Sequence, residues 1–121
     1  MDIRYTADHE WLAIDGNTAR VGITDYAQSL LGDLVFVELP AVGREVPRGS
    51  AVGTVESVKA ASEVYAPLTG TIIEVNSHAM EDPSVVNSDP MGAGWLFTIQ
   101  FQESSQLSEL LTEADYNRLA K

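Results

Sequence analysis

Lys59 is the residue whose type and position are best suited to chemistry in this sequence. The chain contains two lysines, Lys59 and the terminal Lys121, so Lys59 is its only internal primary amine. This scarcity is unusual, because lysine is among the commonest residues of soluble proteins. An amine on a flexible four-carbon stem is a suitable acceptor for an amide bond. We therefore interpret Lys59 as a candidate attachment site, with an ordinary solvated turn lysine as the alternative.

The residues around Lys59 predict the tip of a β-hairpin. Lys59 lies between two β-type runs, residues 51–55 and 64–66. A protruding turn on a rigid scaffold lets a modifying enzyme reach the amine and gives a swinging arm a fixed base. The two alanines that follow Lys59 keep the approach open, and we expect Val58 to anchor the turn from below.

Short β-type runs separated by turn residues make up most of the rest of the chain. Each is rich in β-branched or alternating apolar residues. The Asp15-Gly16-Asn17 turn between the first two predicts an N-terminal hairpin. The runs are Trp11 to Ile14, Ala19 to Ile23, Leu34 to Leu39, Ala51 to Val55, Val64 to Ala66, Thr71 to Val75 and Leu96 to Phe101.

Helical patterns occur in two places. A short helix is predicted over Tyr26 to Leu31, with a cap at Thr24 or Asp25 and a left-handed glycine, Gly32, at its end. After Phe101, leucines recur at helical spacing, which predicts one or two short amphipathic C-terminal helices. These helices should pack around a mainly β body.

A seven-residue pattern, Gly-x-aliphatic-aliphatic-x-Val-polar, occurs twice, at Gly32 to Glu38 and at Gly70 to Asn76. Lys59 lies between the copies. Two similar half-sheets packed face to face and joined by a hairpin would produce such a duplication. A shared need for core packing can also produce it.

Composition excludes several functions. Acidic residues outnumber basic ones 18 to 7, and the formal net charge of −11 argues against electrostatic binding of nucleic acid and favours a monomer. Without cysteine there is no disulfide, thiolate metal site or cysteine nucleophile. His9 and His78 alone supply too few ligands for structural zinc, so we assign no metal site.

The length and the apolar pattern indicate one domain. A chain of 121 residues can form a single core, so we expect one domain over residues 1–121. The apolar runs are too short to cross a membrane, and the start Met1 to Arg4 lacks the regions of a signal peptide. We expect a soluble, cytoplasmic protein that does not associate with membranes.

The run Glu56 to Gly70 closely resembles the lipoylation site of glycine cleavage system H proteins. Nearly the whole chain shares the resemblance, which implies a hybrid barrel-sandwich fold of two similar half-sheets with short peripheral helices, including a C-terminal helical segment. Four more segments resemble the family in the same order: His9 to Trp11, Val21 to Gln28, Leu31 to Pro40, and Val86 to Pro90 continuing to Gly94 and Trp95.

The resemblance implies a non-catalytic carrier with lipoate attached covalently to Lys59. A lipoate-attaching enzyme would form that bond, and a pyridoxal-phosphate glycine decarboxylase would load an aminomethyl group onto the arm. An aminomethyltransferase would pass the one-carbon unit to tetrahydrofolate, and dihydrolipoamide dehydrogenase would reoxidise the arm. Tethering would raise the effective concentration of the cargo at each partner.

Glu10 and Glu63 are candidate contacts of the arm or its cargo. The loaded arm carries an amine on a carbon bonded to sulfur, which water can decompose, so a cleft that holds it would be useful. The alternative for each is a solvated carboxylate, and it is favoured more for Glu63 than for Glu10. Met91 and Ala93 depart from the family pattern of tyrosine and an acidic residue, beside the expected docking surface.

Three alternatives stay open at this point. The chain could be a lipoyl or biotinyl domain of another multienzyme complex, although such domains typically have Asp-Lys-Ala or Met-Lys-Met where this chain has Val58-Lys59-Ala60. It could be a lipoyl-relay protein that donates lipoyl groups to other enzymes. It could also be an unmodified β-rich interaction module.

Overall fold

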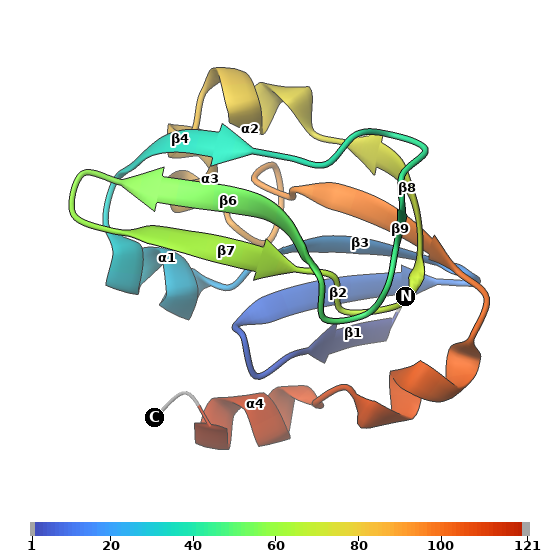
Figure 1. Ribbon diagram of the computed structural model, residues 1–121. Coiled ribbons are helices and arrows are strands. Elements are labelled where there is room, and N and C mark those ends of the chain that lie inside the picture. Colours follow the sequence, from blue (N-terminus) through green and yellow to red (C-terminus); the bar gives the residue numbers. More distant parts are fainter. Residues whose placement is uncertain (1, 120–121) are drawn as a thin grey trace.

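Two antiparallel β-sheets form the body of the protein in a computed structural model that describes residues 2–119 (Figure 1). The larger sheet has the order β1 (Asp2–Tyr5), β2 (Glu10–Asp15), β3 (Thr18–Ile23), β9 (Phe97–Phe101), β8 (Gly70–Val75) and β5 (Glu45–Val46). The smaller sheet has the order β4 (Leu34–Glu38), β6 (Ala51–Ser57) and β7 (Ala61–Tyr65). The predicted mainly β fold is confirmed.

The core lies between the sheets, because the inward faces of both contribute buried aliphatic side chains. Leu12 and Ile72 of the larger sheet are fully buried, and Val55 and Val64 of the smaller sheet are nearly so. Burial of each such side chain contributes roughly 1.5–3 kcal/mol to folding. The two sheets are therefore held together by one continuous apolar cluster.

The seven predicted strands are all present, and β1 and β5 were missed. β5 has only two residues, and β1 has two exposed residues among its four, so neither has a clear alternating pattern. The two copies of the seven-residue pattern form β4 and β8 and lie in different sheets, as expected for two half-sheets. The sheets are unequal, because the N-terminal strands extend only the larger one.

The first predicted helix is confirmed as α1 (Asp25–Leu31). Thr24 is its N-cap, since its side-chain oxygen accepts a hydrogen bond from the Ala27 N–H at 3.2 Å. Gly32 ends the helix with φ 84°, a backbone conformation that favours glycine. The sequence missed α2 (Ser77–Glu81) and α3 (Ser84–Ser88), which are too short to display helical periodicity.

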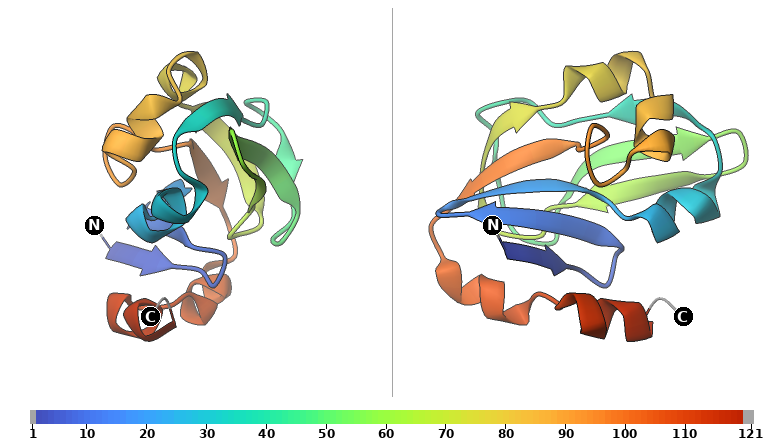
Figure 2. Two further views of the ribbon diagram at one scale, coloured as in Figure 1. Left: turned by 90° about the vertical axis from the view of Figure 1, so that its left-hand side faces the viewer. Right: turned by 180° about the vertical axis from the view of Figure 1, so that it is seen from behind.

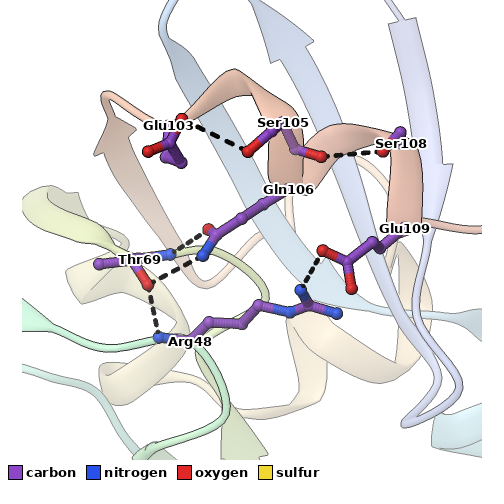
Figure 3. A network of polar contacts seen from close by, with 7 residues as sticks. All are labelled: Arg48, Thr69, Glu103, Ser105, Gln106, Ser108 and Glu109. Carbon is purple, nitrogen blue, oxygen red and sulfur yellow. Dashed lines mark hydrogen bonds and ion pairs between the residues drawn. The ribbon is translucent and has the colours of Figure 1, made fainter.

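The C-terminal segment consists of a 3₁₀ helix, η1 (Ser104–Glu109), followed by α4 (Glu113–Leu119), as expected for one or two short helices. Side chains fix η1 to the loops beneath it (Figure 3). The Gln106 side-chain amide accepts a hydrogen bond from the Thr69 backbone N–H and donates one to the Thr69 hydroxyl. The same hydroxyl accepts a hydrogen bond from the Arg48 backbone N–H, and the Arg48 side chain forms an ion pair with Glu109 at 2.8 Å. The network anchors the tail to the body.

Tyr116 anchors α4 to the edge of the larger sheet. Its ring stacks on Tyr5 of β1 with centroids 4.8 Å apart, and both residues are buried. Figure 2 shows α4 running beside β1 in both views. No helix within residues 2–119 is long and apolar enough to cross a membrane.

Candidate functional site

Lys59 lies at the tip of the hairpin that joins β6 and β7, where the sequence placed it. The tip is exposed, and the hairpin projects at the α1 end of the molecule (Figure 1). Ser57 closes the turn: its backbone N–H donates to the Ala60 carbonyl at 2.7 Å, and its hydroxyl accepts from the Ala60 N–H at 3.1 Å. A short, hydrogen-bonded turn therefore presents the amine to solvent.

Val58 does not anchor the turn, contrary to the sequence-based expectation. Its side chain is 88% exposed. The alternation that buries Val55 does not continue through the turn, and the hydrogen bonds of Ser57 hold the backbone instead. An exposed valine next to Lys59 leaves an apolar surface beside the amine.

The Lys59 side chain lies against Gly32, the residue that ends α1. A Cβ placed on Gly32 would be 3.4 Å from Lys59 Cε and 3.8 Å from Nζ, which is ordinary van der Waals contact. α1 has no basic residue in its last turn, and Lys59 brings a positive charge near this end of the helix, where cations are favoured. No local sequence pattern indicated that Lys59 and Gly32 lie together.

Glu63 is exposed on β7, opposite Thr54 of β6 in the strand register. It belongs to the same hairpin as Lys59. Within the described part of the chain, no ion pair or hydrogen bond joins Glu63 to Lys59. An exposed carboxylate on this strand is available to a positively charged group near the hairpin.

Glu10, the first residue of β2, is buried, at 2% exposure, and lies next to the end of β7. One carboxylate oxygen accepts the Tyr65 backbone N–H at 2.7 Å, and the other accepts the Thr6 hydroxyl at 3.2 Å. Burial raises the pKa of Glu10 to about 8, against the lowering effect of the Tyr65 N–H. The structure therefore places Glu10 beneath the base of the hairpin rather than beside Lys59.

His9, next to Glu10, connects the tail to α1. With φ 65°, it directs Nδ1 to within 2.8 Å of the Tyr116 hydroxyl, which lies 2.7 Å from Thr24 Oγ1. Thr24 is also the N-cap of α1. Through this chain of contacts, α4 supports the start of the helix whose end contacts Lys59.

Met91 and Ala93 lie on the loop before β9. Met91 is 42% exposed and lines a groove of about 1040 Å³ on the outer face of the larger sheet, with Ile3 and Ile73 among its walls. Ala93 is held by its N–H to the Asp89 carboxylate at 2.8 Å.

Comparison with known proteins places these features in a family. Residues 3–121 match the model of the glycine cleavage H-protein family. The chain is 49% identical over 118 residues to a glycine cleavage system H protein of Carboxydothermus hydrogenoformans, covering 98% of this chain and 91% of that protein. It is 55% identical over 112 residues to the one from Bradyrhizobium diazoefficiens, covering 93% and 92%.

The fold is likewise similar to that of a solved protein. The crystal structure of a glycine cleavage system H protein from Mycobacterium marinum superposes with a TM-score of 0.85 at 45% identity. The match covers 97% of this chain and 94% of that chain. The likeness therefore extends from the sequence to the arrangement of both sheets and the peripheral helices.

Proposed function

The chain belongs to the glycine cleavage H-protein family, and on that premise we propose that Lys59 is the residue to which its lipoyl group is attached. Membership makes the chain a lipoyl carrier of the glycine cleavage system. One observation carries the assignment of Lys59: the only internal lysine of the sequence is exposed at the tip of the β6–β7 hairpin.

The residues around Lys59 suit an amide-linked arm. The Nζ amine would attack the activated carboxyl group of lipoate, losing a proton as the leaving group departs. The hairpin then fixes the base of the arm, because β6 and β7 are paired from Ala51 opposite Tyr65 to Glu56 opposite Ala61, and Ser57 holds the turn. A rigid base with an open approach restricts where the arm can reach without blocking partners.

An attached lipoyl group would supply the sulfur and redox chemistry that the three partner enzymes need. Glycine decarboxylase and aminomethyltransferase would use its sulfur atoms to carry the aminomethyl group, and dihydrolipoamide dehydrogenase would reoxidise its dithiol to the disulfide. The chain itself tethers and presents this group. Its net charge of −11 favours partner surfaces that are basic around the entrance to their active sites. We propose a single carrier domain over residues 1–121, acting as a monomer.

Glu63 and Glu10 are proposed contacts of the arm or its cargo. Glu63 suits this role directly, because its exposed carboxylate lies on the same hairpin as Lys59. Glu10 would have to exchange its contacts with Thr6 and Tyr65 for the cargo amine. Glu10→Ala should speed hydrolysis of the aminomethylated form, and an unchanged half-life of that form excludes the role.

Intact mass tests the attachment site. The wild type and Lys59→Arg are each incubated with a lipoate-attaching enzyme, lipoate and ATP, and their masses are compared. We expect one lipoyl increment on the wild type and none on Lys59→Arg, which retains the positive charge but lacks an acylatable amine. A wild type without the increment would falsify the assignment of Lys59.

A second experiment separates the glycine shuttle from a lipoyl-relay role, since both begin with the same modified lysine. The lipoylated protein is mixed with glycine decarboxylase and glycine. We expect an aminomethyl adduct on the arm. If no adduct forms under conditions where a related H protein is loaded, the relay role becomes the better account.

A further inference from the structure

Asn87 on α3 uses its entire side-chain amide to hold the end of α1. Its Oδ1 accepts the Leu34 N–H at 2.8 Å, while its Nδ2 donates to Gln28 Oε1 at 2.8 Å and to the Gly32 carbonyl at 2.9 Å. The backbone N–H of Gly32 donates to the Gln28 carbonyl at 3.0 Å. One half-buried side chain thus fixes the residues on both sides of Gly32.

Gly32 also lies next to the Lys59 side chain. Gly32 has φ 84° and ψ −162°, a region that is almost restricted to glycine, and it carries no Cβ between its backbone and the Lys59 stem. Asn87 therefore fixes the position of Gly32, and the end of the Lys59 side chain lies beside this glycine. α1 and α3 are in contact, and Figure 2 shows them next to each other.

We propose that Asn87 is a positioning residue for Lys59: its amide fixes the Gly32 end of α1, against which the Lys59 side chain rests. This inference rests on the proposed attachment of lipoate to Lys59. A free lysine side chain samples many rotamers, and a fixed contact surface reduces that number before the attaching enzyme binds. Asn87 does not touch the amine and acts only through Gly32.

Asn76 provides a matched control. Its Nδ2 donates to the carbonyl oxygens of Ala93 and Trp95 at 2.9 and 2.7 Å, so it also holds a loop by its amide. Among the residues that the structure describes, it makes no hydrogen bond with α1, Gly32 or Lys59. Truncation of either asparagine removes comparable hydrogen bonds, but only truncation of Asn87 should alter the surroundings of Lys59.

The experiment combines a spectroscopic and a kinetic readout. Protein labelled with ¹³C-lysine has only two ε-methylene signals, and Lys59→Arg assigns the Lys59 signal. In the unmodified wild type we expect a nuclear Overhauser contact between the Lys59 ε-methylene and the α protons of Gly32. It should be lost in Asn87→Ala and retained in Asn76→Ala.

Lipoate attachment is then measured on the same three proteins. We expect kcat/KM for Asn87→Ala to be about tenfold below that of the wild type, and Asn76→Ala to be within about twofold of it. If Asn87→Ala does not fold, Asn87→Asp replaces it. The aspartate retains the acceptor for the Leu34 N–H and removes both donations, so the same two changes are expected.

The outcomes are separable. Three outcomes would each overturn the positioning role. The Overhauser contact between Lys59 and Gly32 could be absent from the wild type, or it could persist in the Asn87 variant. The third is an equal rate of lipoate attachment for the Asn87 and Asn76 variants. A wild type that shows the contact and is not lipoylated would instead reject the proposed function. In that case the contact between Gly32 and Lys59 would stand as a structural feature.

Discussion

The two copies of the seven-residue pattern occupy different positions in the fold. Residues 32–38 contain β4, which is an edge strand of the smaller sheet. Residues 70–76 contain β8, which lies between β9 and β5 in the larger sheet. The first aliphatic position of each copy is buried, with Leu34 5% and Ile72 0% exposed. The copies are therefore alike where they face the core.

They differ at the glycine. A Cβ on Gly70 would lie 2.2 Å from the carbonyl oxygen of Gln100 on β9, which is far inside van der Waals contact. A Cβ on Gly32 would lie 3.4 Å from the nearest atom, Lys59 Cε. Gly70 is required because another backbone approaches closely, whereas Gly32 is required by its positive φ and leaves room for Lys59. The same residue type thus allows close strand packing in one copy and leaves room for the Lys59 side chain in the other.

The largest effect expected from this comparison is that of Gly70→Ala. The added methyl group would force β8 and β9 apart at the clash with Gln100, so we expect a loss of about 3 kcal/mol or more in the free energy of unfolding. Urea denaturation followed by tryptophan fluorescence measures it. The comparison between the glycines is wrong if Gly70→Ala costs no more than Gly32→Ala.

The next prediction concerns Glu10, through which the larger sheet contacts the end of β7 in the smaller sheet. Burial raises the pKa of Glu10 from 4.5 to about 8 in the folded protein. The folded state therefore binds the proton more tightly than the unfolded state, and this contribution to stability is complete below about pH 4.5 and lost as the pH rises through about 8.

Glu10→Gln mimics the protonated carboxyl group at every pH. We expect it to be about 4–5 kcal/mol more stable than the wild type at pH 9 and within about 1 kcal/mol of it at pH 5, because the pKa of Glu10 rises from 4.5 to about 8 on folding. Thermal unfolding from pH 5 to 9 gives the two profiles. Parallel profiles would mean that Glu10 does not carry the raised pKa.

Gly32→Ala should have a smaller effect than Gly70→Ala. No backbone atom blocks the added methyl group, so the main cost is the positive φ of Gly32, which we expect to lower the free energy of unfolding by about 1–2 kcal/mol. Urea denaturation measures this cost, with the exposed neighbour Asp33→Ala as the control. A change for Asp33→Ala as large as that for Gly32→Ala would show that the glycine conformation is not the cause.

The smallest effects are expected at the outward aliphatic positions, which are equivalent in the two copies. Val35 is 58% and Ile73 40% exposed, so Val35→Thr and Ile73→Thr should each change stability by about 0.5 kcal/mol or less. Both variants keep a β-branched side chain suited to a strand. A much larger loss at one position would indicate that the copies differ along the strand as well as at the glycine.

The sequence predicted those features that neighbouring residues determine. The seven strands, the α1 helix with its Thr24 cap and Gly32 terminus, and the Lys59 hairpin all follow from alternation, turn chemistry and capping over a few residues. β1 and β5 were missed because β1 is half exposed and β5 has only two residues. α2 and α3 were missed because five residues make little more than one helical turn, which is too short to show a helical period.

Only the tertiary structure decided how distant residues meet at the site. The sequence singled out Glu10 and Lys59, but burial of Glu10 under Tyr65 and contact of Lys59 with Gly32 depend on how the two sheets pack. Asn87 reaches Gly32 from 55 residues away. Such contacts leave no local pattern, because they are set by the packing of whole elements, whereas the type of each element is set by the spacing of its own residues.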